Sequence, residues 1–251
     1  MRTFHDSWIM FKRCLVTSLR SPETLVQATI VPVFMMLLFG GVFANIVDIE
    51  GFSYINFIVP GIILQSLAQG SAATAINVNG DMSRGIIDRF RSMSIANNAV
   101  LVGHAMAAIA RNILTTSVTI GAAFIIGFRP QGSFLEWLLA AVLLVLFIVA
   151  ITWLAILFGL IAKNAENANG LMFPLYILPF VSSGFAPTDT MPAALRWFAA
   201  HQPMTPMIDA IRALTMGQPT GNALWLALGW GALIAVGSYA LALVAYRRKN
   251  A

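Results

Sequence analysis

The feature that most constrains this chain is a series of long apolar stretches with almost every basic residue outside them. Each is close to or longer than the roughly 20 residues that a helix needs to cross the hydrocarbon core of a bilayer. Because backbone polar groups in lipid must bond to one another, we expect transmembrane helices. The chain is predicted to be a single all-α integral membrane domain over residues 1–251, with six transmembrane helices. The predicted spans are residues 26–47, 54–75, 102–128, 134–162, 168–187 and 223–246.

The composition excludes the ordinary soluble classes. Only 10% of the residues are charged, whereas soluble domains average about 25%. The net charge of +5 does not indicate nucleic acid, because the basic residues sit at the ends of the predicted spans, where they report orientation. A single cysteine, Cys14, excludes a disulfide within the chain and a cysteine-based metal site.

The basic residues predict that both termini are cytoplasmic. Eleven of the 15 Lys and Arg residues fall on the side that the termini share, and three fall on the other side. Cytoplasmic loops carry this excess. The remaining one, Arg111, lies inside the third predicted span, where we expect it to reach toward the cytoplasmic face or to line a wet interior. The eleven are Arg2, Lys12, Arg13, Arg20, Arg84, Arg89, Arg91, Lys163, Arg247, Arg248 and Lys249.

The N-terminal residues 1–22 contain a basic amphipathic pattern, with Phe4, Trp8, Phe11, Leu15 and Leu19 at helical spacing. Such a helix is expected to lie in the interface, in contact with membrane lipid. A helix that binds a soluble partner is the alternative.

Residues 80–96 form the longest predicted cytoplasmic connection and contain a second amphipathic pattern. Ile87 and Phe90 share one helical face, and Arg84, Asp88 and Arg91 share another. An apolar stripe edged with charge suits a docking element. A helix that lies on lipid fits the pattern equally well.

Residues 188–220 are unusually apolar for a loop, and prolines interrupt them. We expect two short helices broken by proline. A re-entrant hairpin on the extracellular side would bury their apolar faces. Asp209 and Arg212, three residues apart, are expected to form a structural pair.

Inside the predicted spans, Gln65, Gln69 and Asn77 give the second one a polar face. This face either lines a translocation path or bonds to a neighbouring helix. Pro174 and Pro179 are expected to break the fifth span. Glycines are expected to allow close helix approach in the last span, at Gly229 and Gly237.

Several catalytic motifs are missing. The sequence has no GxxxxGK[ST] phosphate-binding loop, no HExxH and no GxSxG, so neither ATP binding nor hydrolysis by zinc or serine is supported. No Asp or Glu lies deep in a predicted span, which argues against the alternative of an ion-coupled secondary transporter. We expect a translocation subunit that is not an enzyme alone and has no energy source of its own.

In their order and spacing, several segments resemble the ABC-2 type permeases of ATP-binding-cassette exporters, above all the daunorubicin-resistance group. The resemblance covers nearly the whole chain. It departs from the family at Ser94, where a proline is common, and at Ala107 or Ala108, where an acidic residue is common. The segments are Arg20-Ser21-Pro22, Pro32, residues 39–43, residues 85–93, Gly103 with Arg111, residues 127–130, residues 183–187, Met191-Pro192, Leu195-Arg196, Pro203 and residues 209–212.

The resemblance implies a homodimer or paralogous heterodimer of permease subunits with two copies of a separate ATPase, which binds ATP and Mg; this chain needs no cofactor. Residues 1–22 would be the interfacial elbow. The substrate would be an amphipathic drug or lipid-like compound that leaves across a bacterial cytoplasmic membrane, or alternatively a lipid or polysaccharide precursor. The ATPase would contact Arg84, Ile87, Asp88, Arg89, Phe90 and Arg91. The hairpin that caps the pathway would include Met191, Pro192, Pro203, Asp209 and Arg212.

Overall fold

The computed structural model describes residues 22–42, 53–83 and 99–249, and within these ranges every regular element is a helix. The predicted all-α class is therefore confirmed. In chain order the elements are α2 (Pro22–Val42), α3 (Tyr54–Ser83), α5 (Ala99–Ile126), α6 (Phe134–Ile161), α7 (Ala165–Ile177), η1 (Thr188–Thr190), α8 (Ala193–His201), α9 (Met204–Met216) and α10 (Ala223–Lys249).

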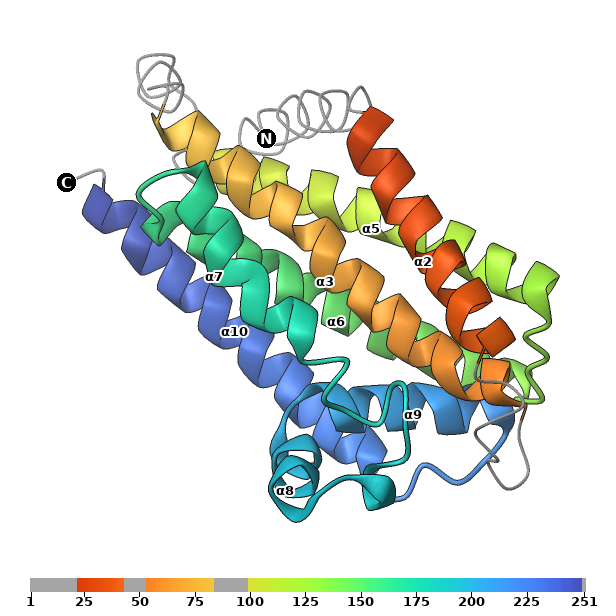
Figure 1. The fold of residues 1–251 in the computed structure, drawn as a ribbon. Coiled ribbons are helices and arrows are strands. Elements are labelled where there is room, and N and C mark those ends of the chain that lie inside the picture. The colour runs from red at the N-terminus through yellow and green to blue at the C-terminus, as the bar shows by residue number, and fades with distance from the viewer. Residues whose placement is uncertain (1–21, 43–52, 84–98, 250–251) are drawn as a thin grey trace.

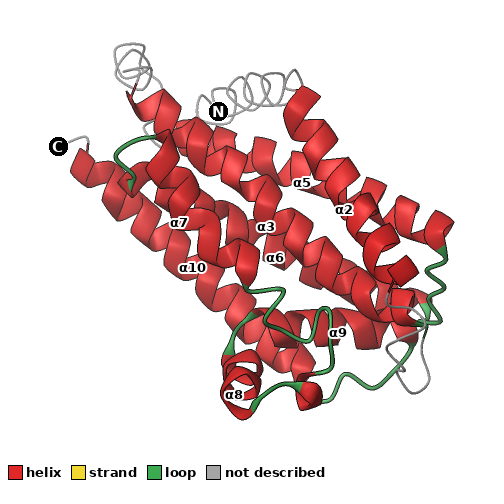
Figure 2. Cartoon of the chain, viewed as in Figure 1, coloured by secondary structure: helices red, strands yellow, loops and turns green. Residues whose placement is uncertain are grey.

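The long helices lie side by side in one bundle, and α8 and α9 sit at one end of it (Figure 1). Loops connect the helices at the two ends of the bundle (Figure 2). The central helix is α3, which packs against α2, α5, α6, α7 and α9. Most of its side chains are buried, so α3 joins these five helices, while α10 packs against α6 and α9.

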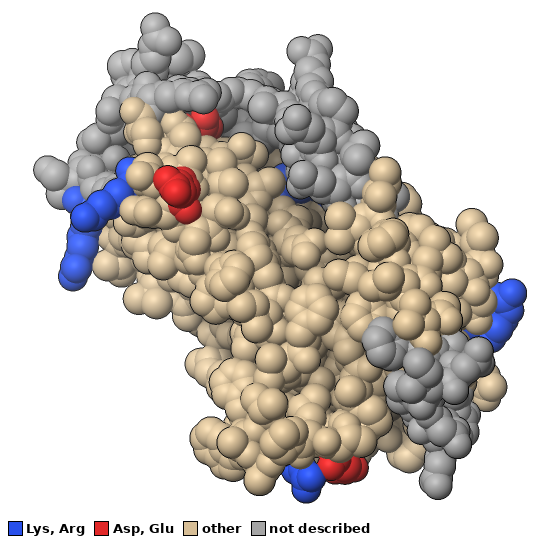
Figure 3. Space-filling model, viewed as in Figure 1, with Lys and Arg blue, Asp and Glu red and all other residues tan. Residues whose placement is uncertain are grey.

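Four of the described helices are long and apolar enough to cross a membrane. The apolar part of α2, Ile30–Val42, is shorter, and α7 has only 13 residues. On the face drawn in Figure 3, the charged side chains of the described residues lie mostly toward the two ends, with a broad uncharged band between them. This distribution is that of a multi-pass membrane protein. The four helices are Tyr54–Ser83, Val100–Ile126, Phe134–Ile161 and Ala223–Arg248.

The second predicted span continues further than expected. It was expected to end at residue 75, but α3 runs to Ser83. Its polar last turns are stabilised inside the protein, because the Asn79 amide donates to the carbonyls of Gly159 and Ala162 at 3.1 and 2.9 Å. A polar sequence therefore remains helical here because a neighbouring helix end accepts its hydrogen bonds.

The fifth predicted span is shorter than expected as a helix. The prediction covered residues 168–187, whereas α7 ends at Ile177 and turns follow it to residue 185. Pro179 has no N–H to donate to the preceding turn, and the chain tightens, with Phe180 N–H bonding the Ile177 carbonyl at 2.9 Å. The predicted break at Pro179 is confirmed, whereas Pro174 lies inside α7.

The two short helices expected within residues 188–220 are present as α8 and α9. The chain turns between them at Gln202 and Pro203. Gly217 ends α9 with φ of 67°, a left-handed conformation that favours glycine. In Figure 1, α9 lies across the ends of the long helices.

Close approaches at glycine occur at positions other than the predicted ones. A Cβ atom on Gly61 of α3 would lie 2.7 Å from the Cα of Gly184, so glycine is required there. At Gly229 and Gly237, by contrast, no atom from another of the described helices comes within 4 Å of such a Cβ atom. The prediction of close packing at these two glycines was therefore wrong for contacts among the described residues.

Candidate functional site

The candidate site consists of polar contacts along α3, in two regions. The first, here called the α3–α5 seam, joins α3 to α5. The second, here called the Arg212 cluster, joins the other end of α3 to α9 and to the turns after α7. The seam comprises Gly70, Ser71, Thr74 and Asp81 of α3 with His104, Arg111 and Asn112 of α5; the cluster comprises Phe57, Ser183, Asp209 and Arg212.

The seam has contacts at two levels. At one level, Arg111 Nη2 donates to the Gly70 carbonyl at 3.1 Å and to Thr74 Oγ1 at 2.8 Å. Beside them, Asn112 Nδ2 donates to Ser71 Oγ at 3.3 Å. At the other level, nearer the ends of the helices that flank residues 84–98, His104 Nε2 lies 3.1 Å from Asp81 Oδ2.

Arg111 occupies neither of the two environments that were expected from the sequence. Its side chain is 3% exposed and lies between α3 and α5. Gly70 allows α5 to lie close to α3 beside Arg111, since a Cβ atom on Gly70 would lie 3.2 Å from Asn112 Oδ1. Burial of a guanidinium is tolerated where its donors find partners, and here a carbonyl and a hydroxyl of α3 provide them.

The Arg212 cluster connects three segments through one side chain. Arg212 Nε donates to the Phe57 carbonyl of α3 at 3.0 Å, and Nη2 donates to the Ser183 carbonyl in the turns after α7 at 2.5 Å. Its Nη1 binds Asp209 Oδ1 at 2.8 Å, which confirms the predicted pair. The guanidinium also lies 3.8 Å from the centre of the Phe57 ring, within the range of a cation–π contact.

Burial lowers the pKa of Arg212 to about 10, while Asp209 acts in the opposite direction. The guanidinium therefore remains protonated near neutral pH. A permanent charge at this position can hold the irregular backbone around Ser183 through charge-assisted hydrogen bonds.

Further polar contacts reinforce the same end of the molecule. The Gln202 amide donates to the carbonyls of Leu178 and Val181 at 3.3 and 3.2 Å. The Tyr54 hydroxyl donates to the Phe185 carbonyl at 3.0 Å. The turns after α7 are thus held by side chains from α3 and from the segment of α8 and α9.

The remaining hairpin residues of the prediction lie at helix boundaries. Met191 follows η1, and Pro192 precedes α8. Pro203 precedes α9 and is half-buried. Of the five predicted hairpin residues, only Asp209 and Arg212 are brought together in the cluster.

The three polar residues expected on one face of the second span have different surroundings. Gln65 is buried, Gln69 is half-buried and Asn77 is exposed. The groups of α3 that bond to α5 are instead the acceptors on Gly70, Ser71 and Thr74, together with Asp81. Gln65, Gln69 and Asn77 stay predictions as pathway-lining residues.

The predicted coupling residues Arg84, Ile87, Asp88, Arg89, Phe90 and Arg91 lie outside the described residues, as does almost all of the predicted elbow, residues 1–22. The structure does place the two helices that flank the coupling segment. Ser83 is the last residue of α3 and Ala99 the first of α5. The seam therefore joins the two helices between which the coupling segment is inserted.

Sequence reasoning missed Asn79, His104, Asn112 and Gln202 as structural polar residues. They could have been noticed as polar side chains within otherwise apolar stretches, because a polar side chain in lipid needs a partner. Their partners could not be read from the sequence, because these hydrogen bonds join residues as much as 83 positions apart.

Comparison with known proteins identifies the chain. The model of a family described as "ABC-2 type transporter" matches residues 5–216. A daunorubicin resistance ABC transporter permease, DrrB1 of Streptomyces coeruleorubidus, is 28% identical, with 95% of this chain and 85% of the relative covered. A probable doxorubicin resistance ABC transporter permease, DrrC of Mycobacterium tuberculosis, is 27% identical over 95% of this chain and 87% of its own.

A more distant relative is similar over most of its length. The inner membrane transport permease YadH of Escherichia coli is 25% identical, with 83% of each chain covered. The family match, the permeases among the relatives and the membrane-length helices all lead to one assignment. The chain belongs to the ABC-2 type transporter family, and it is the transmembrane permease subunit of an ABC exporter whose ATPase activity is carried by a separate subunit.

Proposed function

We propose that this permease exports amphipathic drugs or lipid-like compounds across the cytoplasmic membrane of a bacterium. The likeness to permeases named for daunorubicin and doxorubicin resistance supports this substrate class. Two copies of the ATPase and a second permease subunit would complete the exporter, with ATP and Mg bound by the ATPase.

The observation that carries the mechanism is the α3–α5 seam. The ATPase would dock on residues 84–91, and closure of its dimer would push on this segment. Because the side chains of Arg111, Asn112 and His104 bind α3, the two flanking helices would move together instead of sliding apart. A packed pair of helices that moves as one body is an ordinary way to link a remote site to a pathway.

The membrane arrangement of the proposal has six spans, with α2 and α7 added to the four long helices. Both termini would be cytoplasmic, as the distribution of basic residues indicates. The segment of α8 and α9 would then lie on the extracellular side as a re-entrant hairpin. This position of α8 and α9 is supported by the apolar residues that α9 buries, which include Met204, Met207 and Ile211.

The hairpin would cap the pathway, and Gln65, Gln69 and Asn77 of α3 would line part of it. Since α3 packs against five other helices, a displacement at its coupling end would reach the Arg212 cluster at the other end. Opening toward the outer leaflet would follow from this displacement.

The decisive experiment replaces two coupling residues, Arg89→Ala with Phe90→Ala, in the complex with the ATPase. We expect loss of drug efflux at normal membrane expression, because the apolar and charged docking contacts are both removed. Arg247→Ala with Arg248→Ala is the matched control, because both side chains are exposed at the end of α10. Undiminished efflux in the Arg89/Phe90 variant would contradict the docking role.

A second experiment tests the substrate class. A strain that lacks the permease is compared with its parent for resistance to amphipathic antibiotics and for lipid content. Lost resistance with an unchanged lipid profile supports drug export. An accumulated lipid or polysaccharide precursor with unchanged resistance would instead show that the permease exports that precursor.

A further inference from the structure

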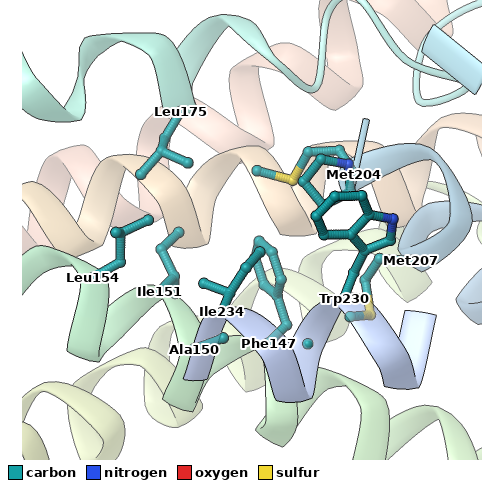
Figure 4. A pocket seen from close by; sticks show the side chains of 11 residues that line it. Phe147, Ala150, Ile151, Leu154, Leu175, Met204, Met207, Trp230 and Ile234 are labelled. Atoms are coloured by element: carbon teal, nitrogen blue, oxygen red, sulfur yellow. The ribbon is translucent and has the colours of Figure 1, made fainter. Parts of the chain in front are cut away.

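An apolar recess lies between α6, α7, α9 and α10 (Figure 4). It is partly open, and its empty space, including the open mouth, is about 380 Å³. Every lining side chain is apolar except for the indole N–H of Trp230. The principal lining residues are Phe147, Ile151, Leu175, Met204, Trp230 and Ile234.

The recess follows from the lengths of the surrounding helices. α7 ends at Ile177, shortly after it contributes Leu175, whereas α6 and α10 are 28 and 27 residues long. At Gly231, α10 comes close to α6, since a Cβ atom there would lie 2.8 Å from Leu146 Cδ2. Met204 and Met207 of α9 add flexible side chains to the wall. Methionine adapts to apolar ligands of irregular shape.

The surroundings of the recess indicate its occupant. α6 and α10 are two of the helices long and apolar enough to cross a membrane, and the outer face of α10 exposes Leu226, Leu233 and Val236. In a membrane permease such exposed residues contact hydrocarbon, and an apolar recess beside them offers water no partners. The lining also has no charged group that would hold a lipid headgroup.

We propose that this recess binds one acyl chain of a membrane phospholipid. The bound chain would contact α7 through Leu175 and α10 through Trp230 and Ile234, which are half-buried, while the buried Met204 and Met207 of α9 form the floor of the recess. Filling an apolar recess restores the dispersion contacts that an empty one loses. The proposal requires only that the chain is a membrane permease, and it is independent of the exported substrate.

The test uses the full permease–ATPase complex in nanodiscs that contain a phospholipid with a photoreactive group in one acyl chain. After illumination, labelled residues are mapped by mass spectrometry. We expect labelling of the lining residues Leu175, Trp230 and Ile234 to exceed that of the exposed Leu233 and Val236 several-fold.

Matched variants on α10 test the position of the acyl chain. Ile234→Trp fills the recess and is expected to reduce labelling of Leu175 and Trp230 several-fold, whereas Val236→Trp, on the exposed face, is expected to leave this labelling unchanged. Ala150→Val fills the recess to a smaller extent and is the substitute variant if Ile234→Trp fails to assemble with the ATPase.

Two outcomes would overturn the proposal. One is labelling that is not specific for the recess: the recess and the exposed face are labelled equally, or the labelling persists in the Ile234→Trp variant. The other is displacement of the probe by an amphipathic drug at a concentration that leaves labelling of Leu233 unchanged, which would assign the recess to the exported substrate instead of lipid.

Discussion

Arg111 and Arg212 are both buried arginines that bind α3, yet their partners differ. Arg111 joins two regular helices, through a hydroxyl and one backbone carbonyl of α3. Arg212 joins α3, α9 and the turns after α7, through two carbonyls and a carboxylate.

The difference indicates separate roles for the two ends of α3. The backbone around Ser183 is not helical, so its carbonyls depend on side-chain donors in a membrane. The helices at the seam, by contrast, form their own backbone bonds, and the seam adds contacts between them. We therefore expect substitutions in the Arg212 cluster to reduce stability first, and substitutions in the seam to reduce transport first.

The largest expected effect comes from Arg212→Ala. The change leaves the Ser183 carbonyl without its donor and removes the partner of Asp209. We expect the free energy of unfolding in detergent to fall by about 3 kcal/mol, the upper range for hydrogen bonds that involve a charged group. Thermal unfolding of the purified permease measures it.

Arg196→Ala is the control for this variant, because Arg196 is exposed on α8 and its guanidinium also binds backbone carbonyls. Its expected loss is below about 0.5 kcal/mol, as for other surface substitutions. If the two variants lose the same stability, the contrast between the Arg212 cluster and an ordinary surface arginine disappears.

Gly61→Ala should have an intermediate effect at the same end of α3. The added Cβ atom would lie 2.7 Å from backbone atoms of Gly184, which cannot move aside as a side chain can. We expect a loss of about 2 kcal/mol, typical of overpacking, by thermal unfolding. Gly121→Ala, in open space on α5, should be neutral or stabilising by up to about 1 kcal/mol. A stable Gly61→Ala protein would show that the turns after α7 can shift.

The smallest change in stability is expected in the seam, for Thr74→Val. Valine keeps the shape but removes one acceptor of Arg111, the Thr74 hydroxyl, and we expect a loss of about 1 kcal/mol. Efflux per ATP hydrolysed by the reconstituted complex should fall more than this stability loss explains. Thr74→Ser retains the hydroxyl and should restore efflux. Normal coupling in Thr74→Val would refute the role of the seam in transmission.

The sequence predicted local features well. The fourth predicted span, 134–162, matches α6 at Phe134–Ile161. The helix begins after Ser133, which forms a capping box with Glu136 of the first turn, and the residues after Glu136 are apolar as far as Ile161 with few exceptions. The pair of Asp209 and Arg212 was predictable for the same reason, since both residues lie on one helix, three positions apart.

Features that depend on distant residues were not predictable. Pro179 predicted a break after Ile177, but the apolar residues that continue to residue 187 did not reveal that turns held by Gln202 and Arg212 follow it. The partner of Arg111, Thr74, lies 37 positions away, and no spacing rule connects residues of different helices. The polar end of α3 was interpreted as a loop because its acceptors, at the end of α6, are likewise distant in sequence.

The early end of α7 has a consequence for biosynthesis. The carbonyls of Leu178 and Ser183 receive their side-chain donors from Gln202 and Arg212, which are made 24 and 29 residues later. During translation, these carbonyls therefore await donors that the ribosome has not yet added. The segment after α7 reaches its final hydrogen bonding only when α9 has been synthesised. We therefore expect α7, α8 and α9 to reach their final structure together during insertion into the membrane.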